Sequence, residues 1–230
     1  MSNSDVPVLT LDGPSGAGKG TVARLVSNRL RWHLLDSGAI YRALALTAER
    51  AGVMNGDIEA LIGIACTMAV DFQMDERGKV RVLLNGSDVT SAIRSEVCGE
   101  RASQVAALPA VRCALLQCQR EFRQPPGLVA DGRDMGTVVF PDAVVKIYLT
   151  ASVEERAHRR YKQLMEQGIS GNLPPLLKEI EARDERDRTR AASPLVPAPD
   201  AISVDTTGKS VAAVVDVILS QMRQRVNFVL

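Results

Sequence analysis

Residues 6–30 read VPVLTLDGPSGAGKGTVARLVSNRL and contain three successive patterns. The run from Val6 to Leu11 is rich in β-branched and apolar residues, which predicts a short strand buried on both faces. A glycine-rich segment follows at once, and from Lys19 to Leu30 apolar residues recur at helical spacing. Strand, glycine loop and helix in this order are the first unit of an α/β fold.

The loop between strand and helix has the pattern G-x-x-x-x-G-K. Its glycines allow backbone N–H groups to converge on an anion, while the helix N-terminus and Lys19 add positive charge. Because a predicted strand precedes it and a predicted helix follows, we interpret it as a phosphate-binding loop (P-loop). The residues expected to contact ATP are Gly13, Pro14, Ser15, Gly16, Ala17, Gly18, Lys19, Gly20 and Thr21.

One position departs from the usual P-loop. Gly20 stands where most such proteins have the Ser or Thr that ligates magnesium, and Thr21 comes one residue late. This form is typical of nucleoside monophosphate kinases and indicates Mg-ATP as the phosphoryl donor. We expect the Mg²⁺ to be held through phosphates and water rather than directly by the protein, with Thr21 as the one side chain that could contact it.

The rest of the chain continues the α/β alternation with one interruption. Further strands are predicted at 33–35, 128–131, 144–149 and 201–205, and a β-hairpin at 70–73 and 80–84 interrupts the alternation. Residues 168–175 are expected to form a loop before a charged helix from Leu176 to about Arg190. The predicted fold is an α/β P-loop three-layer fold: a central parallel sheet of about five strands, an insertion with a small β-sheet, and a helical lid.

Charged side chains suggest a second anion site facing the P-loop. Arg42 lies one helical turn beyond Gly38, and residues 130–136 (ADGRDMG) follow a buried strand at the end where open parallel sheets bind ligands. We expect this second segment to be an open loop, too glycine-rich for packing. Two arginine faces follow on predicted helices: Arg156, Arg159 and Arg160, and then Arg183, Arg186, Asp187 and Arg190. Together they indicate a lid that brings positive charge onto a transferring phosphoryl group.

Composition excludes other classes. With 28 Lys and Arg against 27 Asp and Glu, the net charge is +1, and aromatic residues are 3% of 230 residues, which disfavours a nucleic-acid-binding module. The run from Leu61 to Val70 is too short to span a membrane. The four cysteines form no C-x-x-C pair and no signal-peptide pattern opens the sequence, so we expect a cytoplasmic protein. We also expect a monomer.

Several motifs together resemble those of bacterial cytidylate kinases over essentially the whole chain. They are residues 13–21 (GPSGAGKGT), 35–42 (LDSGAIYR), 102–106 (ASQVA), 131–137 (DGRDMGT) and 183–188 (RDERDR). The resemblance implies a P-loop core at 1–37, 104–152 and 171–230. It also implies a monophosphate-binding domain with a β-rich insertion at 38–103 and a lid at 153–170.

The resemblance further implies transfer of the γ-phosphoryl group of Mg-ATP to CMP or dCMP, giving CDP or dCDP and ADP. Cytosine would be surrounded by Ser37, Ser103, Arg112 and Asp134, its α-phosphate held by Arg42 and Arg133, and the sugar and phosphates approached by Arg183, Asp187 and Arg190. The catalytic residues would be Lys19, Arg133, Arg159 and Arg160, and Arg156 would join the ATP site. A carboxylate at Asp134 suits the exocyclic amine of cytosine, and a guanidinium at Arg112 suits its ring acceptors.

Two alternatives remain open at this point. The first is another small-molecule P-loop kinase, of the adenylate or shikimate type. The second is a GTP-hydrolysing switch protein, since residues 205–208 (DTTG) spell D-x-x-G. That motif follows the last predicted strand, however, and no N-K-x-D guanine motif occurs in the sequence.

Overall fold

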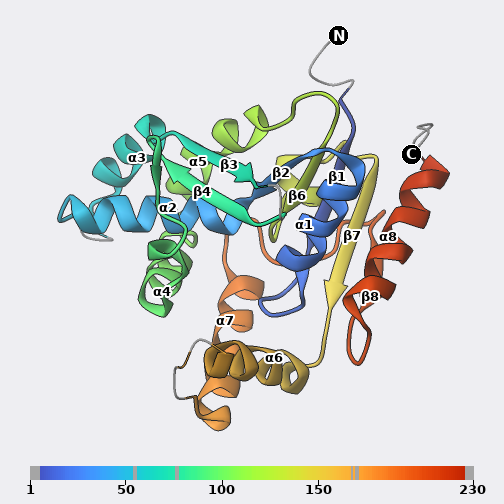
Figure 1. Ribbon diagram of the computed structural model, residues 1–230. Coiled ribbons are helices and arrows are strands. Elements are labelled where there is room, and N and C mark those ends of the chain that lie inside the picture. The colour runs from blue at the N-terminus through green and yellow to red at the C-terminus, as the bar shows by residue number, and fades with distance from the viewer. Residues whose placement is uncertain (1–5, 54–55, 76–77, 167, 169–170, 226–230) are drawn as a thin grey trace.

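The computed structural model of the chain describes residues 6–53, 56–75, 78–166, 168 and 171–225 (Figure 1). Its centre is a sheet of five parallel strands, as predicted, in the order β2-β6-β1-β7-β8. The strands are β1 (Val8–Asp12), β2 (His33–Asp36), β6 (Leu128–Asp131), β7 (Val145–Thr150) and β8 (Ile202–Asp205). Because all five run in one direction, the acidic residues that end β1 and β6 lie at the same edge of the sheet.

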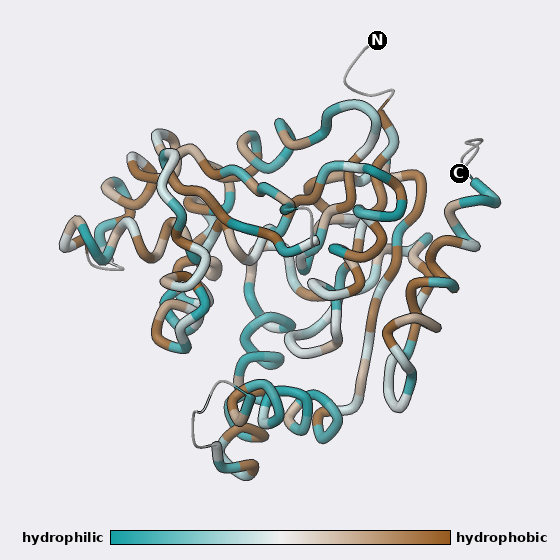
Figure 2. The backbone as a smooth tube through the Cα atoms, viewed as in Figure 1, coloured by the Kyte–Doolittle hydropathy of each residue, from teal (hydrophilic) through white to brown (hydrophobic). Residues whose placement is uncertain are grey.

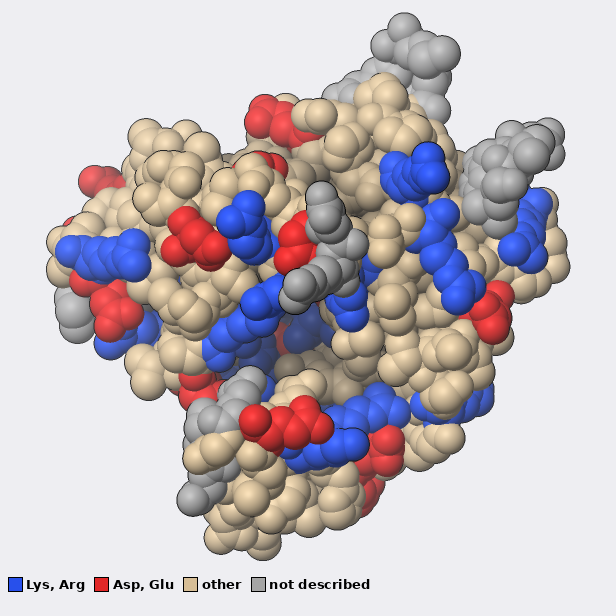
Figure 3. Space-filling view, in the orientation of Figure 1, with Lys and Arg blue, Asp and Glu red and all other residues tan. Residues whose placement is uncertain are grey.

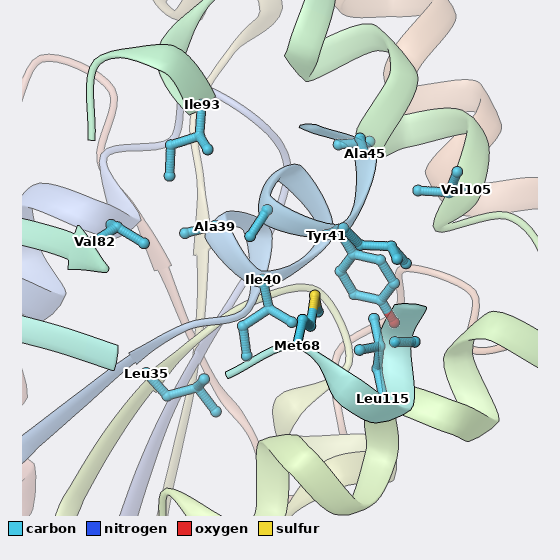
Figure 4. Packing of buried hydrophobic residues seen from close by; sticks show 14 of the residues in the cluster. Leu35, Ala39, Ile40, Tyr41, Ala45, Met68, Val82, Ile93, Val105 and Leu115 are labelled. Carbon is cyan, nitrogen blue, oxygen red and sulfur yellow. The ribbon is translucent and has the colours of Figure 1, made fainter. Parts of the chain in front are cut away.

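Both faces of this sheet are covered, which explains the continuous apolar run of its central strand. On one face Leu9 and Leu11 pack with α1 (Lys19–Leu30) and α8 (Val211–Arg225). On the other face Val8 packs in a cluster with α2 (Ser37–Arg50), α3 (Ile58–Thr67) and α5 (Pro109–Glu121). Figure 4 shows Ile40 and Tyr41 of α2 in this second cluster, close to Met68 and Leu115.

The predicted hairpin is present as a separate antiparallel sheet. Strand β3 (Val70–Met74) pairs with β4 (Val80–Leu84), and β4 pairs with a short β5 (Ser87–Asp88) that the sequence did not indicate. A 3-10 turn, η2 (Ala92–Arg94), and α4 (Glu96–Val105) lead back toward α5. Val82 and Leu84 belong to the same hydrophobic cluster as strands of the main sheet, so the small sheet and one face of the large sheet share a core.

Two helices stand apart from this body. Helices α6 (Val153–Glu166) and α7 (Leu173–Thr189) pack on each other at the bottom of Figure 1, and Figure 2 shows α6 largely in hydrophilic colour. The expected loop through residue 175 is wrong, because α7 already begins at Leu173. Pro174 and Pro175 fall in its first turn, where a missing N–H costs no hydrogen bond within the helix.

The segment after β6 also differs from expectation. Instead of an open loop, Met135–Val139 form a single π-helical turn (η3) and Met135 is completely buried. A Cβ added to Gly136 would lie 2.9 Å from Thr10 Oγ1, so this glycine permits close packing against β1. Glycine here serves packing as well as function. Within the described part of the chain, no helix combines the length and apolar character needed to cross a membrane.

Candidate active site

The P-loop wraps between β1 and α1 as its pattern predicts. Gly13, Gly16 and Gly18 have φ values of 141°, 80° and 90°, and a Cβ on Gly13 would lie 2.0 Å from the carbonyl oxygen of Leu149. Glycine is therefore required at Gly13 both for its conformation and for its close approach to β7. The ammonium of Lys19 is buried and donates to the carbonyl of Pro14 at 2.7 Å, so the side chain folds back onto the P-loop.

A cleft of about 1630 Å³ opens beside this loop. Its walls come from the P-loop, helices α2 and α4, the end of β6, helices α6 and α7, and the start of α8. Figure 3 shows Lys and Arg side chains gathered around the hollow between the body of the molecule and α6 below it. The predicted site residues that line the cleft include the P-loop from Ser15 to Thr21, Arg42, Arg133, Arg156, Arg159, Arg160 and Arg183.

Two carboxylates at the strand ends lie near Lys19, and neither was among the predicted site residues. Asp12 accepts hydrogen bonds from the backbone N–H groups of Met135 and Gly136 at 2.9 and 2.8 Å, which fixes the turn after β6. Burial raises the pKa of Asp12 to about 6 and that of Asp131 to about 7, although Lys19 works against both increases. Acidic residues that end buried parallel strands were the available sequence signal.

Burial also changes the pKa of Lys19. Desolvation, assisted by the positive charge of Arg133, lowers it to about 7, while Asp131 and Asp12 act in the opposite direction. An anion placed in the P-loop would favour the charged ammonium and reverse the shift. The P-loop, Lys19 and the two carboxylates therefore form one coupled electrostatic unit.

Five of the predicted substrate residues join in a single buried network. Arg112 pairs with Asp134, Arg133 donates to Asp187 at 3.0 Å, and Arg190 lies 4.0 Å from Asp134 and 3.9 Å from Asp187. These five residues come from three separated parts of the chain: α5, the β6–η3 segment and the end of α7. Burial would raise the pKa of Asp187, but the neighbouring guanidinium groups of Arg133 and Arg183 lower it overall.

Several donors in this network and next to it are buried without a hydrogen-bond partner among the described residues. They are Arg112 Nε, Arg183 Nε and Arg190 Nη2. Burial and the nearby charge of Arg133 lower the pKa of Arg183 to about 10. Unsatisfied buried donors are costly, and their clustering beside a cleft fits a ligand that carries acceptor atoms.

The remaining substrate residues have partners within the protein. Arg42 donates to the carbonyls of Ile93 and Ser95 at 2.8 and 3.4 Å while it lines the cleft. The hydroxyl of Ser37 is buried and donates to Gln119 at 2.8 Å, and Ser103 accepts from Arg186 at 3.3 Å. Neither Ser37 nor Ser103 is among the residues that line the cleft.

The three arginines of α6 have different surroundings although they share one helix face. Arg156 is 3% exposed; it donates to the carbonyls of Ser15 and Ala151 at 3.1 Å each and pairs with Asp184 at 2.6 Å. Arg159 donates to the hydroxyl and carbonyl of Thr206 at 3.1 and 2.7 Å. Arg160 pairs with Glu96 of α4 across the cleft.

The residues around the P-loop suit a magnesium ion held mainly by water. No group of three His, Cys, Asp or Glu side chains in the described residues could enclose a metal. The side chain absent at Gly20 is replaced in space by Asp131, whose Oδ2 lies 3.4 Å from where a Cβ on Gly20 would be. A carboxylate at this position can accept from a water of hydrated Mg²⁺, a cation that keeps several waters in most protein sites.

The D-x-x-G sequence does not form a switch site in this fold. Asp205 accepts from the backbone N–H and the hydroxyl of Thr207 at 2.9 and 2.7 Å, so it closes its own turn. Strand β8, which it ends, is at the edge of the sheet and separated from β1 by β7. The motif is therefore a local turn.

Comparison with known proteins agrees with this geometry. The cytidylate kinase family matches residues 9–224 of the chain. The cytidylate kinase of Pseudomonas paraeruginosa is 57% identical, covering 97% of this chain and 98% of its own; that of Sodalis glossinidius is 56% identical, covering 95% and 96%. The cytidylate kinase of Marinomonas sp. is 54% identical, covering 94% and 95%. A P-loop, an arginine-rich cleft and similarity along nearly its whole length show that the chain belongs to the cytidylate kinase family.

Proposed function

We propose that the protein transfers the γ-phosphoryl group of Mg-ATP to CMP or dCMP and releases ADP with CDP or dCDP. Family membership supports the reaction class, and one observation supports the acceptor: the buried Arg112–Asp134 pair beside the P-loop cleft. This pair presents both a carboxylate and a guanidinium, as recognition of the amine and ring acceptors of cytosine requires. Uracil would place its O4 against the carboxylate.

The network that contains this pair can hold the rest of the acceptor nucleotide. Arg133 lines the cleft and is bonded to Asp187, so it joins the base-reading residues to the phosphate side of the site. We assign the α-phosphate of CMP to Arg42 and Arg133, and the sugar to Arg183 and Asp187. Arg190, whose guanidinium lies between Asp134 and Asp187, completes the acceptor site on the phosphate side.

The donor side is assigned to the P-loop and α6. Backbone N–H groups of the loop and Lys19 would hold the phosphates of ATP, and Arg159 and Arg160 would neutralise charge on the group in transfer. Bound Mg²⁺ supplies further charge neutralisation on the phosphates, with Asp131 and Thr21 as the nearby protein groups. The reaction needs no covalent intermediate, because the acceptor phosphate oxygen attacks in line with the departing ADP.

The division into moving parts belongs to the same proposal. Residues 153–170 act as the lid and 38–103 as the monophosphate-binding part, and closure excludes water that would otherwise hydrolyse ATP. Ion pairs already connect α6 and α7 to α4, through Arg160 with Glu96 and Arg186 with Glu100. We also propose a cytoplasmic monomer, in keeping with four free cysteines.

A coupled assay of ADP release tests the acceptor. Mg-ATP is supplied with CMP, dCMP, UMP, AMP, GMP, shikimate or no acceptor. Rapid turnover with CMP and dCMP and slow turnover with the others supports the proposal. Preference for AMP or shikimate would contradict the base site, and steady hydrolysis without an acceptor would contradict the proposed closure.

The roles of the arginines are tested by substitution. Arg133→Ala and Arg159→Ala are each expected to lower turnover by roughly 10²- to 10⁴-fold, because each removes charge stabilisation from the transfer step. Arg188→Ala is the matched control, since Arg188 is exposed on α7 and, among the described residues, forms an ion pair only with Glu185 three residues earlier. Near-normal turnover in either test variant would remove that residue from the mechanism.

A further inference from the structure

A buried polar contact joins α2 to α5 behind the acceptor site. The hydroxyl of Ser37 lies 2.8 Å from Oε1 of Gln119, and one turn further along α2 the ring of Tyr41 lies 5.5 Å from the guanidinium carbon of Arg112. Arg112 and Gln119 are seven residues apart on α5 and so share one face of that helix. Figure 4 shows Tyr41 pointing toward Leu115, which lies between them on α5. Gln119 of α5 is thus the hydrogen-bond partner of Ser37, which the family resemblance assigns to the base.

A second contact, to the backbone of its own helix, determines the orientation of the Gln119 amide. Its Nε2 donates to the backbone carbonyl of Leu115 at 3.3 Å. A carbonyl can only accept, so the amide nitrogen must face Leu115 and the amide oxygen must face Ser37. Gln119 and Ser37 are 2% and 4% exposed, which leaves the pair shielded from bulk water.

This arrangement fixes the hydrogen of the Ser37 hydroxyl. Because Oε1 of Gln119 is an acceptor, the single hydroxyl hydrogen must point to it. The Ser37 oxygen then offers only lone pairs to any other partner. A serine that would otherwise donate or accept becomes an acceptor toward the base site.

We propose that Gln119 is a positioning residue for base specificity, which holds Ser37 as an acceptor for the exocyclic amine of cytosine. The inference rests on the proposed function and on the expectation, implied by the family resemblance, that Ser37 lies against the base. With Ser37 and Asp134 both accepting, the site can use both hydrogens of the amine. Uracil has the acceptor oxygen O4 at that position, so the acceptor oxygens of Ser37 and Asp134 would face another acceptor with no hydrogen between them.

Removing the amide frees the hydroxyl. In Gln119→Met the Ser37 hydroxyl can rotate and donate to O4 of uracil, so discrimination against UMP weakens. We expect the ratio of kcat/KM for CMP to that for UMP to fall roughly tenfold, the order of effect of one misplaced hydrogen bond in a polar site. Gln117→Met is the control: the same replacement on the same helix, at an exposed residue whose side chain donates to Glu121, with no expected change in the ratio.

A cycle with Ser37→Ala separates positioning from general damage. In the Ser37→Ala background, where no hydroxyl can rotate, Gln119→Met should leave the ratio of kcat/KM for CMP to that for UMP unchanged. Loss of packing alone would lower kcat/KM for both nucleotides equally and would produce no fall of the ratio even when Ser37 is present. Gln119→Glu is a second variant that keeps an oxygen toward Ser37, and its ratio should stay within about threefold of the parent.

The outcomes are distinct. The inference is overturned if the CMP-to-UMP ratio is unchanged in a folded Gln119→Met protein. It is also overturned if Gln119→Met lowers this ratio as much in the Ser37→Ala background as it does with Ser37 present. In both cases the proposed function stands. A parent protein that does not use CMP overturns both. A tenfold fall that disappears in the Ser37→Ala background supports the role of Gln119.

Discussion

Replacing Arg156 by Met tests whether this arginine acts by holding the P-loop. Its guanidinium reaches three parts of the chain: the carbonyl of Ser15 in the P-loop, the carbonyl of Ala151 after β7, and the carboxylate of Asp184 in α7. Only 3% of the residue is exposed. Arg156 therefore supports the P-loop through contacts within the protein, and its assignment to ATP stays a prediction.

The structure sets the size of the expected effect. Removing one member of a buried ion pair costs about 3 to 5 kcal/mol, and the lower end applies because the Asp184 side chain is 25% exposed. A loss of about 3 kcal/mol lowers the melting temperature of a chain of this length by roughly 6 to 12 °C. Arg156→Met with Asp184→Asn should recover part of this loss, because no unpaired carboxylate remains.

Calorimetric melting and steady-state kinetics together measure the effect. The KM for ATP should rise more than the KM for CMP, since the backbone that loses its support is Ser15 of the P-loop. Arg188→Met, which removes an exposed arginine from the same part of the molecule, should change stability by less than about 0.5 kcal/mol. A melting temperature within 1 °C of the parent, or an equal rise in both KM values, would refute the reasoning.

Three further predictions concern other parts of the molecule. Because the pKa of Lys19 is lowered to about 7, its amine is mostly neutral at pH 8. Binding of metal-free ATP should raise that pKa, so that the protein takes up roughly one proton at pH 8 but fewer at pH 6. Calorimetry in buffers of different ionisation enthalpy measures the number of protons taken up. Gly63→Ala, in the exposed interior of α3 with open space around the added Cβ, should stabilise by about 0.5 to 1 kcal/mol, whereas Gly127→Ala, whose Cβ would lie 2.4 Å from the Trp32 ring, should destabilise by about 1 to 3 kcal/mol in urea denaturation. Glu96→Gln removes the charge that α4 offers to Arg160, and amide exchange in α6 should become faster.

Each of these has a result that contradicts it. Heats of ATP binding that do not depend on the buffer at pH 8 would mean that Lys19 is already charged. Equal stability changes for the two glycine variants would mean that the space around them does not control the outcome. Unchanged exchange in α6 would show that the ion pair to α4 does not restrain that helix.

The sequence predicted correctly those parts of the fold that depend on residues close together in the chain. The order strand, glycine loop and helix at the N-terminus needs only adjacent residues, and the β3–β4 hairpin forms between runs only a few residues apart. Five parallel strands followed from the alternation of buried runs and helices. Boundaries were less certain at α7, where prolines in the first turn resembled a loop.

What sequence could not predict depends on contacts between distant segments. Asp12 accepts hydrogen bonds from two backbone N–H groups in the turn after β6, which lie 123 and 124 positions further along the chain, and no local pattern indicates these contacts. Gln119 meets Ser37 across 82 positions, so its polar role in α5 was hidden within an ordinary amphipathic helix. The assignments of individual residues to ATP and CMP stay predictions, while the place of many of them on the wall of one cleft is a feature of the structure.

The distribution of hydrophobic contacts bears on how this chain can change over time. Among the described residues, neither α6 nor α7 contributes a member to the two hydrophobic clusters of the sheet, whereas β4 of the insertion does. Substitution in the insertion must therefore preserve shapes shared with the sheet. The α6–α7 pair is joined to the rest largely by arginines, whose contacts depend on charge more than on fit. Lineages can accordingly alter the length and the outward-facing charge of the pair while the sheet stays as it is, provided that the arginines facing the cleft are kept.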